Sequence, residues 1–316
     1  MRVVFMGTPA LAADVMEGLA GRHDVVLAVT RPDAVSGRGS AKRPTPVKQR
    51  ALDLGIPVLE AERLDDQAQD ALRSYAPDAI CVAAYGCLLP VSVLELPQYG
   101  CLNAHLSLLP RWRGAAPLER ALLMGDSNTG VSVMKMEAGL DTGPYCMQLS
   151  VKTDGRYLED LESELARAGA QALADTLDAL TDEGVTWQEQ DEAAVTYAEK
   201  IGKDELALDP AVGIAQNDAR VRASSDAHPA RCVIADRTVT VEHVHPVRSS
   251  EVPEVLAEAK AGFAYYATKR LYLACADGLL EIEQLKPSGK NSMEGKAFAA
   301  GIQNFKKEPK PWKIVR

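Results

Sequence analysis

The sequence predicts an α/β protein: a doubly wound, mostly parallel sheet domain followed by a small C-terminal β-barrel. Two observations lead to this fold. Up to residue 149, continuous apolar runs alternate with helical patterns, as in parallel sheets whose strands are buried on both faces. After residue 205, short apolar runs are separated by turn signals, which is typical of an antiparallel barrel.

The first domain is expected to be built from alternating strands and helices. Its expected strands are 2–6, 25–30, 55–59, 79–84, 100–105 and 131–136. Its expected helices are 10–20, 47–54, 66–75 and 158–180. In such sheets, ligands bind in the crevice outside the carboxyl ends of the strands, so functional residues are expected in the loops at those ends.

The second domain is expected to consist of short strands and to follow a polar stretch. Its expected strands are 231–235, 238–241, 263–266, 271–275 and 279–282. We therefore place the first domain at 1–186, a linker at 187–205 and the second domain at 206–316.

Composition limits the class of protein. The chain has 316 residues, of which 47% are apolar and 25% charged, and this suits a soluble protein of two domains. No apolar run approaches the roughly 18 residues of a membrane span, and the N-terminal run is too short for a signal peptide, so we expect a cytoplasmic protein. The six cysteines are scattered without a C-x-x-C pair, and are expected to be apolar core residues.

Charge is distributed unevenly along the chain. The net charge is −9 overall, but residues 206–316 contain 16 basic and 13 acidic residues, a net charge of +3. A polyanion is therefore expected to meet the second domain or a local basic loop. One such loop, 31–44, is long for its position, and it is either a phosphate-binding loop or a solvated one. Its four cations are Arg31, Arg38, Lys42 and Arg43.

Two other patterns do not define a site. Gly7-Thr8-Pro9 follows the first expected strand but lacks the G-x-G-x-x-G spacing of dinucleotide-binding enzymes, so we interpret it as a strand-to-helix turn. His243 and His245 have the spacing of two metal ligands on one strand face. Because no third ligand is evident, we expect exposed strand histidines and no metal.

Asn103 and His105 lie at the carboxyl end of the expected strand 100–105. Because side chains alternate across a strand, these two project from the same face. An amide beside an imidazole can polarise a carbonyl oxygen, although an Asn-x-His pair alone is more often structural. Asp141 follows the expected strand 131–136 in a glycine-rich turn. If the two strand ends are adjacent, Asp141 orients the imidazole, and the three side chains suit acyl-type transfer through a tetrahedral intermediate.

The motifs around these residues are similar to a known family. The sequence resembles the 10-formyltetrahydrofolate-dependent formyltransferases in Ser107-Leu108-Leu109-Pro110-Arg111-Trp112-Arg113-Gly114, in the preceding Asn103-x-His105 and in the following Gly139-Leu140-Asp141-Thr142-Gly143. Further motifs are similar to the branch of this family that acts on methionine attached to initiator tRNA. These are Gly7-Thr8-Pro9, Gly37-Arg38-Gly39, Ala84-Tyr85-Gly86, Ala115-Ala116-Pro117 and Thr196-Tyr197-Ala198-Glu199-Lys200. The resemblance covers nearly the whole chain and implies a Rossmann-like first domain and an OB-like second domain.

The resemblance implies transfer of a formyl group from 10-formyltetrahydrofolate, a co-substrate, to the α-amino group of methionyl-initiator tRNA, for translation initiation. Asn103 and His105 would hold the formyl oxygen as it becomes an oxyanion. Asp141 would help to move a proton, through water, from the attacking amine to N10 of the folate. Orientation and oxyanion stabilisation would supply most of the acceleration.

The resemblance also implies which residues bind the two substrates. The folate would lie against Tyr85, Gly86, Cys87, Leu88 and Leu89, against Ser107, Leu108, Leu109 and Pro110, and against Met136 and Gly139. The acceptor end of the tRNA would meet Arg38, Lys42 and Arg43, and its flank would meet the second domain. Phosphate contacts make tRNA binding strongly salt-dependent. We expect a monomer.

Three alternatives remain open. The chain could formylate an amino sugar nucleotide, hydrolyse the same folate to release formate, or be a catalytically silent tRNA-binding paralogue. The basic Gly-Arg-Gly loop and the barrel favour tRNA over an amino sugar, and the presence of all three polar residues argues against a silent paralogue. Leu106 is a departure, because the family usually has a small residue between His105 and Ser107.

Overall fold

The chain forms two compact units, each described here by itself. The computed structural model describes residues 1–35, 42–182 and 184–315. Unit 1 comprises Met1–Pro117, Ser127–Lys152 and Asp160–Glu199. Unit 2 comprises Leu118–Asp126, Thr153–Glu159 and Lys200–Arg316.

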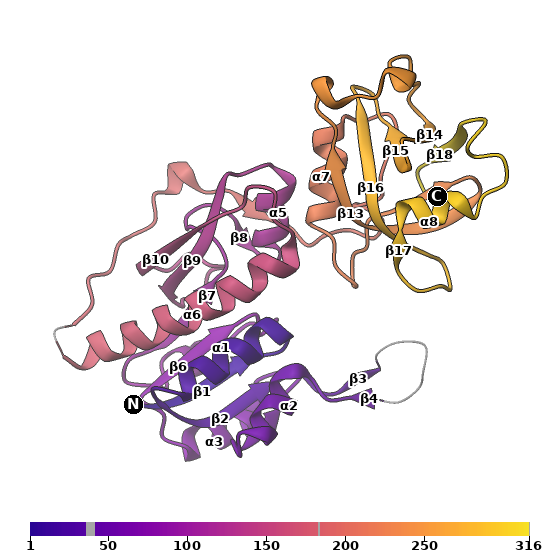
Figure 1. The fold of residues 1–316 in the computed structure, drawn as a ribbon. Coiled ribbons are helices and arrows are strands. Elements are labelled where there is room, and N and C mark those ends of the chain that lie inside the picture. The colour runs from indigo at the N-terminus through magenta and orange to yellow at the C-terminus, as the bar shows by residue number, and fades with distance from the viewer. Residues whose placement is uncertain (36–41, 183, 316) are drawn as a thin grey trace. The chain divides into compact units, whose positions relative to one another are not determined.

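Unit 1 contains a seven-stranded sheet (Figure 1). Its strands are β1 (Arg2–Gly7), β2 (Asp24–Thr30), β5 (Val58–Glu60), β6 (Ala79–Ala83), β7 (Cys101–His105), β9 (Asn128–Lys135) and β10 (Tyr145–Lys152). Their order is β10-β9-β7-β6-β1-β2-β5. The five strands from β7 to β5 are parallel, whereas β9 is antiparallel to both of its neighbours. The expected doubly wound, mostly parallel sheet is confirmed, and the strand β10 is an addition to it.

Helices cover both faces of this sheet. Its main helices are α1 (Ala10–Ala20), α2 (Pro46–Asp53), α3 (Asp66–Ser74), α4 (Val91–Leu94) and α6 (Leu158–Thr181). Helices α1 and α6 pack tightly on one face, where a Cβ on Gly18 would collide with Ala170. On the other face, Leu72 of α3 and Val93 of α4 share a buried core with Val4 of β1. Burial of continuous apolar strands between two helical layers holds the sheet together.

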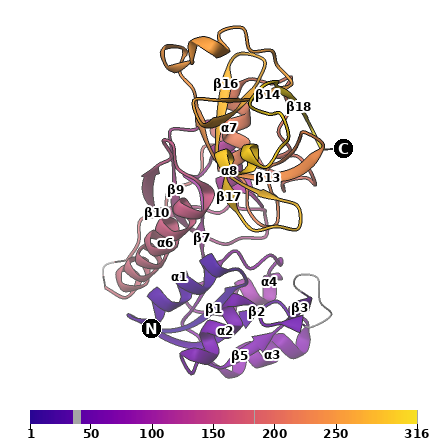
Figure 2. The same ribbon diagram turned by 45° about the vertical axis from the view of Figure 1, so that its right-hand side comes forward.

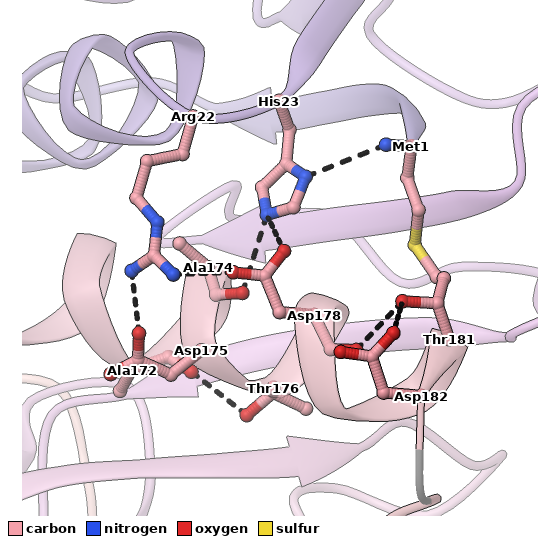
Figure 3. A network of polar contacts seen from close by, with 10 residues as sticks. All are labelled: Met1, Arg22, His23, Ala172, Ala174, Asp175, Thr176, Asp178, Thr181 and Asp182. Atoms are coloured by element: carbon pink, nitrogen blue, oxygen red, sulfur yellow. Dashed lines mark hydrogen bonds and ion pairs between the residues drawn. The ribbon is translucent and has the colours of Figure 1, made fainter.

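A polar network ties the turn after α1 to helix α6 (Figure 3). Arg22 pairs with Asp175, at 2.5 Å, and with Asp178. His23 is buried, and its Nε2 lies 3.2 Å from the carbonyl oxygen of Ala174. Because a carbonyl only accepts hydrogen bonds, Nε2 is the protonated nitrogen of His23. The two ion pairs are exposed, so they contribute little to the free energy of folding.

Unit 2 contains a closed six-stranded antiparallel barrel. Its strands are β12 (Arg231–Ile234), β13 (Arg237–Pro246), β14 (Phe263–Ala267), β15 (Arg270–Ala274), β16 (Leu279–Pro287) and β18 (Lys310–Lys313). The order β13-β12-β18-β14-β15-β16 closes through pairing of β13 with β16. This confirms the expected barrel, whose core includes Trp312, with its indole N–H donating to the Ala274 carbonyl oxygen at 3.0 Å.

Short elements complete unit 2. Helix α7 (Ile214–Arg222) lies against β13 and β16, and helix α8 (Gly295–Ala300) against β15, β16 and the edge strand β17 (Met293–Glu294) (Figure 2). The remaining elements of the chain are β3 (Ala34–Val35), β4 (Lys42–Arg43), β8 (Arg113–Gly114), α5 (Pro117–Leu123), β11 (Tyr197–Ala198) and the 3-10 turns Glu192–Ala194, Ser249–Glu251 and Glu254–Leu256. Within the part of the chain that the structure describes, no helix is long and apolar enough to span a membrane.

The polar stretch after α6 is structured in the part that runs along unit 1. Gln188 exchanges backbone hydrogen bonds with Tyr145, at 2.8 and 3.0 Å. Further along, β11 pairs in parallel with β8. This paired segment, 188–198, is called the strap below, and it lies beside the residues that follow His105 in sequence.

Candidate active site

Asn103 and His105 occupy β7, between β6 and β9. Their side chains share a face because they are two residues apart on one strand. His105 is buried, with 5% of its side chain exposed, and Asn103 is half-buried. Among the residues that the structure describes, no partner hydrogen-bonds to the Asn103 amide, which is therefore available to a ligand.

The imidazole of His105 lies between two hydrogen-bond acceptors. Its Nε2 is 2.8 Å from the carbonyl oxygen of Trp112. Its Nδ1 is 3.7 Å from Oδ2 of Asp141. A carbonyl oxygen only accepts, so Nε2 carries a proton and donates to Trp112. Nδ1 faces the Asp141 carboxylate, and the ring lies on the same face of β7 as the free amide of Asn103.

Asp141 reaches His105 by a different route from the one predicted. We expected adjacent strand ends, but β9 is antiparallel to β7, so Lys135 at its end lies opposite Leu102 at the beginning of β7. The turn 136–144 instead brings Asp141 to the carboxyl end of β7, where its Oδ2 lies 3.7 Å from Nδ1 of His105. Asp141 has a left-handed backbone, with φ +52°. Its Oδ2 accepts a hydrogen bond of 2.9 Å from the backbone N–H of Gly114.

The close packing of this turn explains its glycines. A Cβ on Gly143 would collide with the carbonyl oxygen of Lys135. Gln190, on the strap, donates from Nε2 to the carbonyl oxygens of Asp141, at 2.8 Å, and Gly143, at 2.7 Å. The Asp141 turn is thus held both by its own backbone contacts and by a side chain from far along the sequence.

The segment after His105 is anchored by a serine on the next strand. Ser132 lies opposite His105 on β9, and its hydroxyl donates to the carbonyl oxygen of Ser107 at 2.6 Å. The hydroxyl oxygen of Ser132 in turn accepts from the backbone N–H of Leu109, at 3.0 Å, and from Nε2 of Gln148, at 2.9 Å. Gln148 also donates to the carbonyl oxygen of Leu109, at 2.8 Å. Segment 107–110, proposed to bind folate, is therefore fixed by buried hydrogen bonds.

Four of the eleven predicted folate residues lie in or against one core cluster. Tyr85 and Leu89 are buried in it, and Cys87 and Met136 pack against it. Burial raises the pKa of the Tyr85 hydroxyl to about 12. Leu88 is 80% exposed, which makes an apolar side chain available to a ligand. The other predicted residues lie as follows: Gly86 is exposed with φ +77°, Ser107 and Leu109 are buried, Leu108 and Pro110 are half-buried, and Gly139 is exposed in the Asp141 turn. Leu106, the departure from the family pattern, is half-buried.

The predicted tRNA residues are only partly described. Lys42 and Arg43 are exposed in β4, which pairs with β3. Arg38 lies outside the described residues.

His243 and His245 of β13 are exposed, as expected. The ring of His243 packs edge-on against Tyr157, and His245 Nε2 lies 3.6 Å from a carboxylate oxygen of Glu251.

Sequence reasoning missed the residues that support the site. Ser132 stood within an apolar strand, and Gln148 and Gln190 stood in stretches without a motif. A polar residue inside an otherwise apolar strand was the one available signal, and it applied to Ser132 alone. The carbonyl oxygen of Trp112 and the N–H of Gly114 are backbone groups, and the residue type does not predict that they contact the site.

The fold and the site together define a class of protein, and the chain belongs to the formyl transferase family. The family profile described as "Formyl transferase" matches residues 1–177, and "Formyl transferase, C-terminal domain" matches residues 200–303. Curated relatives include two proteins named methionyl-tRNA formyltransferase. The one from Methylobacillus flagellatus is 36% identical over 305 residues, covering 95% of this chain and 96% of the relative. The one from Bordetella pertussis is 40% identical over 315 residues, covering 96% of this chain and 100% of the relative.

Solved structures have the same fold. HypX from Aquifex aeolicus, in a multiply substituted variant, matches with a TM-score of 0.67 and 16% identity over 96% of this chain. This chain spans about half of HypX, 48% of its length. WlaRD, a sugar 3N-formyl transferase, matches with a TM-score of 0.60 and 13% identity, covering 92% of this chain and 99% of WlaRD. At these identities the likeness concerns the fold alone.

Proposed function

We propose that this chain transfers the formyl group of 10-formyltetrahydrofolate to the α-amino group of methionine on initiator tRNA. The observation that carries the proposal is the unpaired, half-buried amide of Asn103 beside the His105–Asp141 pair. Full-length similarity to relatives named methionyl-tRNA formyltransferase supports tRNA as the acceptor. We also propose that residues 1–186 form the catalytic domain, that 187–205 connect it to a tRNA-binding domain at 206–316, and that the enzyme acts as a cytoplasmic monomer.

The chemistry follows from where the polar groups lie. The amine attacks the formyl carbon, and negative charge develops on the formyl oxygen. The Asn103 amide N–H and the His105 imidazole stabilise that oxygen, since polar groups that are already in place cost no reorganisation when the charge appears. Asp141 keeps His105 oriented and assists proton movement, through water, from the amine to N10 of the folate. The tetrahedral intermediate then collapses: the formyl C=O re-forms, the C–N10 bond breaks, and tetrahydrofolate leaves with the proton on N10. Because an α-amino group titrates near neutrality, little energy is needed to produce the nucleophile.

Two loops that follow strands supply the residues proposed to bind the folate. A solved structure of HypX, a protein of the same fold, is described as a complex with tetrahydrofolic acid. In this chain, Gly86 and Leu88 are exposed in the loop after β6, and Met136 and Asp141 belong to the turn after β9. We propose that these loops hold the pterin and that segment 107–110 lines the same pocket. Lys42 and Arg43 are proposed to meet the acceptor end of the tRNA.

The test is a formylation assay with matched acceptors. Purified protein is incubated with 10-formyltetrahydrofolate and methionyl-initiator tRNA, and formyl-methionine is measured after deacylation. Parallel reactions contain an amino sugar nucleotide, or no acceptor with formate release as readout. We expect product with the tRNA only, and a loss of about 100- to 1,000-fold in kcat in His105→Ala. Absence of formyl-methionine at micromolar enzyme would refute the proposal, and tRNA binding without product would point to a silent paralogue.

A further inference from the structure

We propose that Gln190 is a positioning residue for this reaction: it fixes the turn that carries Asp141, and through Asp141 it orients His105. The inference rests on the proposed function, because it assigns Gln190 a role only through these two side chains. Gln190 belongs to the strap, far from both in sequence. No motif or composition signal marked it.

The contacts of Gln190 use its whole amide. Its Nε2 donates to the carbonyl oxygens of Asp141 and Gly143, at 2.8 and 2.7 Å. Its Oε1 accepts from Nε of Arg113, at 2.9 Å. The orientation of the amide is unambiguous, because two carbonyls can only accept and a guanidinium can only donate. Gln190 is buried. If its side chain were lost, water could not replace it, and the three groups that it binds would each lose a hydrogen bond.

The same strap also holds the groups on the other side of Asp141. Arg113 is almost completely buried, and its second contact is an ion pair of 2.8 Å with the exposed Glu192. Thr196 accepts two hydrogen bonds from this segment. The backbone N–H of Trp112 donates to its hydroxyl oxygen, at 2.9 Å, and the backbone N–H of Arg113 donates to its carbonyl oxygen, at 2.9 Å. The Trp112 carbonyl and the Gly114 N–H, which touch His105 and Asp141, therefore lie on a segment anchored to the strap.

The turn needs such an anchor. Asp141 holds a left-handed backbone that costs energy for a residue with a side chain, so the turn does not keep this shape by local preference. One carbonyl that Gln190 binds belongs to this strained residue, and the other belongs to Gly143, two residues further on. Releasing them frees the turn to relax, and the 3.7 Å separation between Asp141 Oδ2 and His105 Nδ1 is then no longer maintained.

An amide is the one common side chain that fits this position. Glutamate keeps an acceptor for Arg113 but loses both N–H donors and places a carboxylate against two carbonyl oxygens. When protonated it regains a single O–H donor. Methionine has nearly the same length as glutamine and offers neither donor nor acceptor. The charged or titratable groups that face the position are Arg113, Asp141 and His105, with Glu192 on the far side of Arg113.

The experiment compares kcat as a function of pH in wild type, Gln190→Glu, Gln190→Met and the control Gln188→Glu, whose side chain is exposed on the same strap. In Gln190→Glu we expect kcat to fall about 100-fold at pH 8, because displacing a catalytic side chain by about 1 Å lowers the rate by about that factor. KM should change by less than about threefold. The deficit narrows to about tenfold at pH 6 as the new carboxyl gains a proton. Gln190→Met loses activity at every pH, and Gln188→Glu follows wild type.

The outcomes separate this inference from the proposed function. If wild type lacks formyltransferase activity, the proposed function fails, and the inference fails with it. If wild type is active and Gln190→Glu keeps the wild-type kcat and pH profile, the inference alone is overturned. A pH-independent loss in Gln190→Glu, or a loss confined to KM, also overturns it. Failure of both Gln190 variants to fold, judged by thermal unfolding, would make the residue a requirement of the fold and reject a positioning role.

Discussion

His105 is held from two directions by groups of different origin. Asp141, on one side, could be proposed from the sequence, because a carboxylate in a glycine-rich turn after a strand has a recognisable pattern. The Trp112 carbonyl, on the other side, could not, since every residue carries a carbonyl. The reactive side chains were therefore predictable by type and spacing, whereas the backbone groups that orient them depend on the fold.

Removing the charge of Asp141 should abolish most of the activity without unfolding the protein. In Asp141→Asn an amide oxygen still accepts from the Gly114 N–H, but the negative charge facing His105 is lost. We expect kcat to fall about 100- to 1,000-fold, in line with the loss of a charged orienting group in other enzymes. The measurement is single-turnover formylation, together with the thermal unfolding midpoint.

The matched control is Asp154→Asn, which makes the same change at an exposed aspartate in the turn before α6. It should retain the wild-type kcat and midpoint. Normal turnover in Asp141→Asn would remove Asp141 from the mechanism. A large fall in its unfolding midpoint would instead mean that the carboxylate mainly stabilises the turn.

At the scale of elements, sequence patterns gave the parallel part of the sheet but not its antiparallel end. Continuous apolar runs such as β1 and β6 predict strands whatever their direction, and direction is set by the connections. The link from β7 to β9 contains α5 and β8, and returns the chain antiparallel. This reversal is why Asp141 arrives through a turn, and why Ser132, not an end residue, lies opposite His105.

Ser132 on β9 should be required for the folate pocket. Its hydroxyl is fully buried and joins Ser107, Leu109 and Gln148. In Ser132→Ala these groups lose a partner, and we expect the free energy of unfolding to fall by about 3 kcal/mol, within the range for unsatisfied buried polar groups. Because segment 107–110 loosens, KM for 10-formyltetrahydrofolate should rise more than kcat falls.

Urea unfolding and steady-state kinetics check this expectation, and Ser150→Ala provides the control. Ser150 is exposed on β10, where the change should alter the free energy of unfolding by less than about 0.5 kcal/mol. A Ser132→Ala protein with wild-type stability would show that water replaces the hydroxyl. If Ser132→Ala is destabilised but its KM for 10-formyltetrahydrofolate is unchanged, segment 107–110 does not contribute to folate binding.

At the scale of the whole molecule, each unit has its own buried core and its own buried thiols. Cys81 and Cys101 lie in unit 1, and Cys232 and Cys275 lie in unit 2; all six cysteines are free. Sequence analysis expected core cysteines, and these four are buried because small apolar side chains fill tight strand positions. Cys87 and Cys146 are half-buried. Burial raises the pKa of Cys101 to about 12 and of Cys275 to about 11.

These buried thiols make the protein sensitive to alkali. The pKa of Cys275 is raised in the folded state above the ordinary value of 9.0, chiefly by burial. Between about pH 9 and 11 the unfolded chain therefore binds fewer protons at this thiol than the folded one, and the free energy of unfolding falls as pH rises. Below about pH 9 both states hold the proton and the effect vanishes. Over one and a half pH units, one such thiol accounts for about 2 kcal/mol.

Lysines and tyrosines also titrate in this pH range. The contribution of the Cys275 thiol to the pH dependence of the free energy of unfolding is isolated by comparing wild type with Cys275→Ala. Urea unfolding, followed by the combined fluorescence of Trp112, Trp187 and Trp312, is measured from pH 8 to 10.5 in both proteins. The variant lacks the titrating thiol, so its stability relative to wild type should improve by about 2 kcal/mol across this range. Parallel pH dependences would show that the thiol ionises without unfolding, which requires that water reaches Cys275 in the folded barrel. A steeper fall in the variant would reverse the sign and contradict the assignment of burial as the cause.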